Sequence, residues 1–402
     1  MMARALMAAL AMALCPGAMA NAGPISPEAK QEIVNRLQEV LARQAYVGGV
    51  DFSLLRQHLQ AERETLNRAT TEEMFAGALQ QSLRQFGISH VGIIPPEAAS
   101  GMHRSATIGI GAPVRPAQGG LRVLAVSKGS PAERAGLRAG DIIIEVDGKR
   151  ATSAEVLEGP IGSVARLRVR RLSGQVDELR VERQAVEMRH ASTMEELSPR
   201  TAIIRIRSFA QDYETTEIEE LFDRAFEYEN LIIDLRGNGG GAVRNLMHLM
   251  GLLIPEFTPL GTPVSNSLAA EFVAETGGDP TDARAVAEWS TSQKMISGPN
   301  VIGPFPGRVA VLIDGGSASA SEVTSSALRE LRGSLIVGSR SAGALLVSTY
   351  VELPAGFAAQ IPISDYITIK GFRPEGEGVQ PDIEVSGRRE DVERAAREAM
   401  EK

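Results

Sequence analysis

The stretch GRVAVLIDGGSASASEVTSSALRELRG, residues 307–333, contains a strand, a turn and a helix in immediate succession. Its first part is a short apolar run that ends in paired glycines, as a buried strand before a turn does. Its last part places Val323, Ala327, Leu328 and Leu331 at the spacing of one helix face. Strand, glycine turn and helix in this order predict an α/β layer.

Three serines alternate with alanines in the turn of this stretch: Ser317, Ser319 and Ser321. A serine at such a turn lies at a helix N-terminus, where free backbone N–H groups and the helix dipole favour a developing negative charge. This geometry suits acyl transfer. Serine is also a preferred N-cap residue, so the residues alone favour a capping role over a catalytic one.

An α/β core is predicted over residues 195–387. NLIIDLRGNGGG, residues 230–241, repeats the order of buried strand and glycine turn, and a helical pattern follows it. This glycine run lacks the Gly-Lys-Ser/Thr ending of a P-loop, which argues against nucleotide binding. We expect FAAQIPISDYITI, residues 357–369, to continue the same core.

Two segments extend this core. Residues 261–306 are polar and punctuated by Gly and Pro, with one short helix expected at 282–293, and we interpret them as an insertion that covers a cleft. The amphipathic segment 388–402 predicts a closing C-terminal helix.

The chain before the core divides into two regions. Within residues 21–100, apolar residues recur at helical spacing, and we predict three short helices between Ser26 and Phe86. FGISHVGIIPP, residues 86–96, follows as an exposed turn or strand, because Gly and Pro-Pro bracket a short β-like run. Residues 104–187 change to short strands with turn signals. The fold class is therefore α/β (α+β) with several domains.

Composition narrows the classes of function. The chain has 402 residues, of which 43% are hydrophobic, and it carries a formal net charge of −8. This charge argues against nucleic acid or an anionic membrane as a partner, since either requires a concentrated basic face. The histidines other than His90, namely His58, His103, His190 and His248, show no paired ligand spacing, so we predict no metal and no cofactor.

Residues 1–20 resemble a secretory signal, with a short apolar run and a cleavage site at Ala18–Ala20. Cys15, the single cysteine, lies inside it, so the mature chain is predicted to lack disulfides. We expect an exported protein of a bacterial periplasm. No later stretch is apolar and long enough to predict a membrane span.

Residues 130–149, SPAERAGLRAGDIIIEVDGK, closely resemble the most recognisable part of a PDZ domain. IGIGAPV, residues 108–114, resembles the loop and strand to which such domains add a peptide. The resemblance implies a β-barrel-like domain that binds peptide C-termini by β-augmentation.

GSASASE at 316–322, LIIDLRGNGGG at 231–241 and a preceding PDZ domain, in this order, resemble the carboxyl-terminal processing (tail-specific) proteases. Relatives of that family include the tricorn core protease and the retinoid-binding proteins of the eye. The resemblance implies a ClpP/crotonase-like core with Ser319 as nucleophile. It also implies an oxyanion hole from the N–H of Ala320 and from Gly240 or Gly241.

The general base departs from the best-known branch of that family. A lysine stands there in a turn that reads VGSRSAGALLV here, and the matching residue is Ala344, which excludes a Ser-Lys dyad. The tricorn-like branch implies His90 as base, Ser89 as a hydrogen-bond partner and Glu375 as the group that orients His90, directly or through water. Glu377, two residues on, remains an alternative to Glu375.

Two functions follow. The first is an exported serine endopeptidase that cleaves protein or peptide substrates through an acyl-enzyme, with the PDZ domain recognising or gating the substrate. The alternative is an inactive protease-fold scaffold that binds peptide C-termini or a small hydrophobic ligand. No sequence feature supports an adaptor protein.

Overall fold

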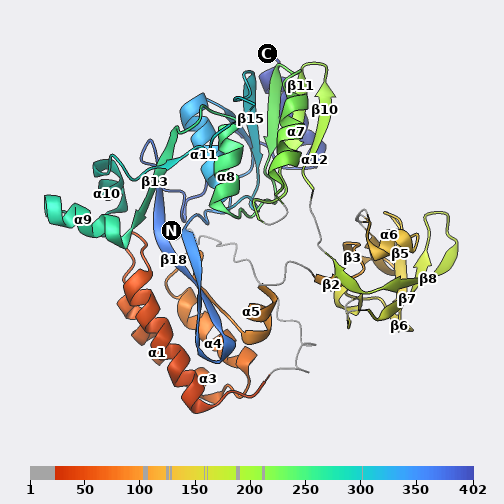
Figure 1. Cartoon of the computed structure of the whole chain (residues 1–402), viewed down its shortest axis with the longest axis horizontal. Helices are drawn as coiled ribbons and strands as arrows, with labels where there is room; N and C mark the ends of the chain where they lie inside the picture. Colours follow the sequence, from red (N-terminus) through yellow and green to blue (C-terminus); the bar gives the residue numbers. More distant parts are fainter. Residues whose placement is uncertain are drawn as a thin grey trace, which may run out of the picture.

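The computed structural model describes residues 23–102, 107–123, 126, 129–157, 159–160, 162–186, 191–210, 213–300 and 302–402. It is a mixed α/β protein with several sheets, and its amino-terminal helices, its small β domain and its α/β core are seen separately in Figure 1. The expected signal segment lies outside the described residues. Among those residues, no helix is apolar and long enough to cross a membrane.

In the described part of the chain, six strands form the core sheet, in the order β10, β11, β12, β15, β16, β19. All neighbouring pairs are parallel except β10 and β11. The strands are β10 (Thr193–Ser198), β11 (Thr201–Arg205), β12 (Asn230–Asp234), β15 (Arg308–Ile313), β16 (Leu335–Gly338) and β19 (Ile383–Glu384).

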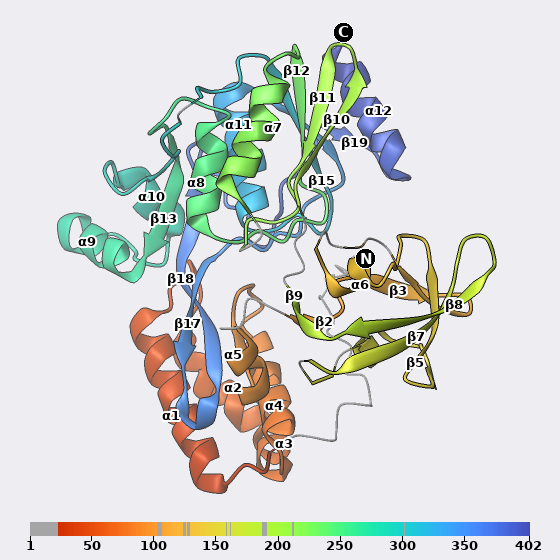
Figure 2. The same ribbon diagram turned by 45° about the vertical axis from the view of Figure 1, so that its right-hand side comes forward.

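The central core strands β11, β12 and β15 are mostly apolar on both faces because helices cover both (Figure 2). One face packs against α7 (Thr215–Ala225), α8 (Val243–Gly251) and α11 (Ala320–Arg332). The other face packs against α12 (Arg389–Met400). Successive residues of β12 alternate between these layers, as the two-residue period of a strand requires.

A second, antiparallel sheet joins the core to the amino-terminal region. It contains β1 (Gly92–Ile94), β18 (Ala358–Thr368), β13 (Pro259–Ser265), β14 (Met295–Ile296) and β17 (Val347–Glu352). The long strand β18 pairs with β1 and β17 over its first half and with β13 over its second. Residues 357–369, expected to continue the core, form β18, which makes a hairpin with β17 and belongs to this second sheet and not to the core sheet, while its Tyr366 packs in the core.

The amino-terminal helices pack against the β17–β18 hairpin. They are α1 (Pro27–Gln44), α2 (Leu55–Ala61), α3 (Arg63–Arg68), α4 (Glu72–Arg84) and α5 (Pro96–Met102), with a 3-10 turn at Phe52–Leu54. The expected number of three helices before Phe86 is wrong, since Glu62, at φ −95° and ψ 9°, separates α2 from α3. Ser26 and Thr71 cap α1 and α4 with their side chains.

The segment 261–306 is more regular than expected. It contains α9 (Asn266–Thr276) as well as α10 (Ala283–Trp289), and only the second helix lies where the sequence predicts one. Ser265 caps α9 by accepting a hydrogen bond from the N–H of Leu268 (3.3 Å). The two helices pack their apolar side chains together above β13 and β18.

The β-rich segment forms its own apolar core. Its main sheet has the order β3, β4, β5, β7, β8, with β6 paired to β5, and β2 pairs with β9. The elements are β2 (Thr107–Gly109), β3 (Val114–Ala117), β4 (Gly120–Val123), α6 (Pro131–Arg134), β5 (Ile142–Val146), β6 (Lys149–Arg150), a 3-10 turn (Ala154–Leu157), β7 (Val164–Arg170), β8 (Val176–Glu182) and β9 (Gln184–Val186). A further 3-10 turn, at Pro354–Gly356, lies outside this segment, between β17 and β18.

Candidate active site

A cavity of about 470 Å³ lies beyond the carboxyl ends of β12 and β15, beside α8 and α11. Ser319 and His90 both line it, although they come from distant parts of the chain. The glycine turn at 239–241 and the segment 345–347 line it as well. The sequence-predicted nucleophile, base and oxyanion residues therefore share one cavity.

Ser319 lies at the strand-to-helix turn that the sequence predicts, and α11 begins at the next residue. Its φ of 53° is rare for a residue with a side chain. Its backbone N–H is held by the carbonyl of Ala344 (3.0 Å) and the carboxylate of Glu322 (3.1 Å). These two contacts fix the unusual turn.

The alternation of the three serines has a structural cause. The fully buried Ser317 hydroxyl donates to the carbonyl of Leu235 (2.8 Å), and the fully buried Ser321 hydroxyl donates to that of Asn238 (2.8 Å). Both acceptors belong to the strand and glycine turn of the neighbouring β12 unit. Ser319, between them, lines the cavity. The flanking serines thus bind the serine turn to the glycine turn.

The glycine turn requires glycine at two positions. Gly240 has φ 96°, and a Cβ there would lie 2.7 Å from the Cβ of Ser319. A Cβ on Gly241 would lie 2.2 Å from the carbonyl carbon of Phe209. The two turns therefore approach more closely than side chains would allow.

Among the predicted oxyanion residues, the backbone N–H groups of Gly241 and Ala320 remain available to a ligand. The N–H of Gly240 donates to the side chain of Asn238 (2.9 Å). Within the described residues, the N–H groups of Gly241 and Ala320 have no hydrogen-bond acceptor. Of the two glycines that the sequence leaves open, Gly241 is therefore the one with a free donor.

His90 ends a hydrogen-bonded chain that begins at Glu375. The Ser89 hydroxyl lies 2.7 Å from Nδ1 of His90 and 2.8 Å from Oε2 of Glu375. The Glu375 carboxylate also accepts the N–H groups of Ser89 (2.7 Å) and Leu345 (2.8 Å). Glu375 itself is 6% exposed.

This chain determines the tautomer of His90. An ionised Glu375 accepts only, so the Ser89 hydroxyl donates to it and accepts from Nδ1–H of His90. Nε2 is then left with a lone pair, which is the form that a proton acceptor needs. Burial lowers the pKa of His90. Burial also raises the pKa of Glu375, against the lowering effect of the hydrogen bonds from Ser89 and Leu345.

Two residues of alternative assignments, Glu377 for the orienting group and Ala344 at the lysine position, make other contacts. Glu377 is exposed, and its carboxylate lies 3.5 Å from Arg284, away from Ser89. Ala344 occupies the turn where the resemblance expects a lysine, and its N–H donates to Glu322 (3.0 Å). Among the described residues, no hydrogen bond joins Ser319 to His90 in this structure.

Glu322 is a site residue that sequence reasoning missed. Its fully buried carboxylate accepts from Ser319 and Ala344, and also from the N–H of Gly343 (2.8 Å) and the hydroxyl of Ser341 (2.5 Å). Burial raises its pKa despite these hydrogen bonds. The signal was present in the sequence, since an acidic residue three positions after a helix-capping serine is typical of a capping box.

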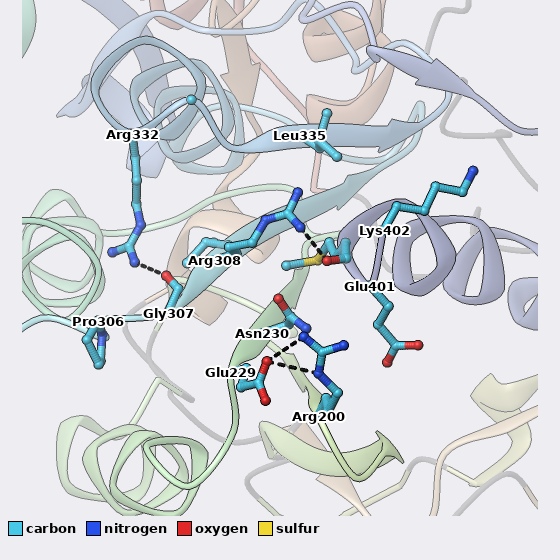
Figure 3. Close-up of a pocket in the computed structure, with 13 residues that line it drawn as sticks. Arg200, Glu229, Asn230, Pro306, Gly307, Arg308, Arg332, Leu335, Glu401 and Lys402 are labelled. Atoms are coloured by element: carbon cyan, nitrogen blue, oxygen red, sulfur yellow. Dashed lines mark hydrogen bonds and ion pairs between the residues drawn. The ribbon is translucent and has the colours of Figure 1, made fainter.

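A larger cavity, of about 660 Å³, lies at the amino ends of the core strands, away from these residues (Figure 3). Arg200 and Glu229 form an ion pair in it, with 2.6 Å between Nη2 and Oε2. None of the predicted site residues lines it. In the described ranges, no group of His, Cys, Asp and Glu side chains is arranged to hold a metal ion.

Comparisons with known proteins match two parts of this chain to protein families. Residues 200–385 match the family described as peptidase family S41, and residues 122–171 match the PDZ domain family. A probable CtpA-like serine protease of Staphylococcus haemolyticus (strain JCSC1435) is 24% identical over 288 residues, covering 69% of this chain and 53% of that protein.

Two further relatives extend this likeness. Carboxyl-terminal-processing peptidase 1, chloroplastic, of Arabidopsis thaliana is 26% identical over 324 residues, covering 76% of this chain and 61% of that protein. The crystal structure of the tricorn protease matches with a TM-score of 0.57 at 16% identity, over 93% of this chain and 37% of that one, and shows a similar fold. The chain thus spans roughly half to three fifths of the length of these two curated relatives.

Proposed function

This chain belongs to the carboxyl-terminal processing protease family, with a peptidase S41 domain and a PDZ domain, and from that premise we propose that it is a serine endopeptidase. The observation that carries the proposal is the chain Glu375–Ser89–His90, which ends at the cavity that Ser319 also lines. It supplies a base at a site where Ala344 leaves no lysine.

The chemistry proceeds in two steps. Nε2 of His90 takes the proton of the Ser319 hydroxyl as Oγ attacks the carbonyl carbon of the scissile peptide bond. The N–H groups of Ala320 and Gly241 stabilise the negative oxygen that develops. His90 then donates its proton to the departing amine, and an acyl-enzyme remains. Water, deprotonated by His90, hydrolyses the ester and restores Ser319.

Glu375 and Ser89 act through His90. The Ser89 hydroxyl connects the Glu375 carboxylate to Nδ1 through two hydrogen bonds. This connection keeps the imidazole in the required tautomer and stabilises the imidazolium that forms. The hydrogen bond from the Ser319 hydroxyl to Nε2 forms when substrate binds, since catalytic hydrogen bonds often tighten only in the substrate complex.

The substrates and location complete the proposal. We assign protein or peptide substrates, whose C-termini the PDZ domain holds by β-augmentation, and export to a bacterial periplasm on the strength of the amino-terminal sequence. The alternative, an inactive scaffold, is favoured if the following experiment contradicts the proposal.

The test is active-site labelling of the purified protein with a fluorophosphonate. Wild type should be labelled, whereas Ser319→Ala and His90→Ala should not. His248→Ala is the matched control, because His248 is a partly buried histidine that is hydrogen-bonded to Tyr213 (2.9 Å) and does not line the cavity. A folded wild type that takes no label would reject the proposal and favour the scaffold.

A further inference from the structure

The side chain of Asn238 makes two hydrogen bonds within the glycine turn. Asn238 is fully buried, its Nδ2 donates to the carbonyl of Ile206 (2.8 Å), and its Oδ1 accepts the N–H of Gly240 (2.9 Å). The partners fix the orientation of the amide, since a carbonyl requires a donor and an N–H requires an acceptor. The side chain therefore joins the exit of β11 to the turn after β12.

The main chain of Asn238 makes the second connection. Its carbonyl accepts the N–H of Ala318 (3.1 Å) and the hydroxyl of Ser321 (2.8 Å), which lie on either side of Ser319. One residue thus contacts the turn that carries the free Gly241 N–H and the turn that carries the nucleophile. The distance between the two oxyanion donors depends on this connection.

The hydrogen bond to Gly240 has a further effect. Gly239, Gly240 and Gly241 all line the cavity. The Asn238 side chain accepts the N–H of the middle glycine, so the turn is held in the conformation in which Gly241 keeps a free N–H. A turn without this internal acceptor would rotate its peptide planes to satisfy the Gly240 N–H elsewhere, since a buried donor without a partner is costly.

We propose that Asn238 is a positioning residue for the oxyanion hole, which selects Gly241 as the donor and holds it in register with Ala320. The inference rests on the proposed function, because an oxyanion hole has a role only if Ser319 forms a tetrahedral intermediate. Asn238 touches no reacting atom and acts through the two turns.

The experiment measures fluorophosphonate labelling under saturating conditions, which separates the affinity of the probe from the rate of bond formation. Asn238→Ala should lower the maximal labelling rate by roughly 10- to 100-fold, because misplaced oxyanion donors lose much of their effect on the transition state. The probe concentration at half-maximal rate should change by less than about threefold, because the ground state does not use the hole.

The control is Asn230→Ala. Asn230 is also a buried asparagine of the β12 unit, but its Nδ2 donates to Thr201 (3.3 Å) at the opposite end of the strand, beside the cavity of Figure 3. It should lose stability without losing labelling rate. Ser321→Ala is the second variant: it removes one hydrogen bond to the Asn238 carbonyl and should lower the maximal rate by about 2- to 10-fold.

The outcomes are distinct. Equal maximal rates for folded Asn238→Ala and Asn230→Ala overturn the positioning role, while the labelling of wild type and its loss in Ser319→Ala keep the proposed function. If Asn238→Ala does not fold, Ser321→Ala decides, and a wild-type rate for it overturns the proposal. A wild type that takes no label overturns the proposed function itself.

Discussion

At the scale of single residues, the Ser89 hydroxyl is the critical link, because the carboxylate of Glu375 contacts it and it in turn contacts His90. The sequence predicts all three residues, but it leaves open whether Glu375 acts directly or through water. The geometry places Ser89 between the two groups. The same geometry separates Glu375 from Glu377, which the sequence pattern alone could not do.

We expect Ser89→Ala to lower kcat/KM by about 10- to 100-fold, since an alanine leaves Nδ1 of His90 without its acceptor and the tautomer unfixed. Ser89→Thr, which keeps the hydroxyl, should recover part of the activity. The measurement is hydrolysis of a fluorogenic peptide by folded variants. Equal rates for wild type and Ser89→Ala would contradict the relay.

The pH dependence follows from His90. Burial lowers its pKa below the ordinary 6.5, so the imidazole is neutral at pH 7 and protonates only on the acid side. Protonation removes the base, and kcat/KM should therefore fall as pH decreases below about 6.5 and stay level through neutrality. A profile of kcat/KM from pH 4.5 to 9 tests this. A basic limb rising above pH 8, as a lysine base gives, would contradict it.

At the scale of elements, the two turns of the site are the features that the sequence signals most clearly. The glycines of the β12 unit and the serines before α11 were both evident as turn signals. Their mutual contacts were not, because Ser317 and Ser321 reach across to a turn 80 residues away in the chain, and no local pattern records such a partner.

Glu322 connects α11 to the turn at 341–344. Glu322→Gln should lower the free energy of unfolding by about 2–4 kcal/mol at pH 7, because the amide NH₂ must then face N–H groups that donate to the carboxylate. Its raised pKa sets the sign of the pH effect: the stability that wild-type Glu322 contributes is largest at low pH and decreases as pH rises through the folded pKa. Urea unfolding at pH 5 and pH 8 measures both. A variant as stable as wild type at pH 8 would reject the bonding pattern.

The ion pairs that hold α12 on the opposite face of the core sheet should affect stability but not the proposed site. Glu393 lies 3.1 Å from Arg205 and 2.8 Å from Arg236, and both ion pairs are largely buried. Glu393→Ala should therefore cost about 1–3 kcal/mol of stability, because it removes one carboxylate from a buried network in which Arg236 keeps Asp234 (2.8 Å) and Arg205 keeps Glu195 (2.9 Å). The fluorophosphonate labelling rate of the folded fraction should stay within about twofold of wild type. A large loss of that rate would show that this face is coupled to the site.

At the scale of the whole molecule, sequence periodicity predicts the α/β class and the closing helix but not the second sheet. FAAQIPISDYITI has the alternation of a strand whichever sheet it joins. Besides the neighbouring β17 it pairs with β1 and β13, whose paired residues are 264–268 and 99–107 positions away along the chain. Propensity and pattern are local, whereas strand pairing is not.

The PDZ domain carries a prediction at this scale. A peptide with a free C-terminal carboxylate should bind the protein at least tenfold more tightly than the same peptide with an amidated end, because the backbone N–H groups of the Gly-rich loop are expected to hold the carboxylate. Binding measured on Ser319→Ala excludes turnover as an explanation. Equal affinities would restrict the domain to a structural or gating role.

The pairing of β1 with β18 has a consequence for how the chain could be divided into two pieces. This short ladder, from Gly92 with Gln360 to Ile94 with Ala358, is what brings His90 to the cavity. A fragment limited to the peptidase segment 200–385 contains Ser319 and Glu375 but neither Ser89 nor His90. Such a fragment lacks the proposed base and should be inactive. If mixing it with a separately made amino-terminal piece restored activity, the two pieces would have re-formed the pairing of β1 with β18.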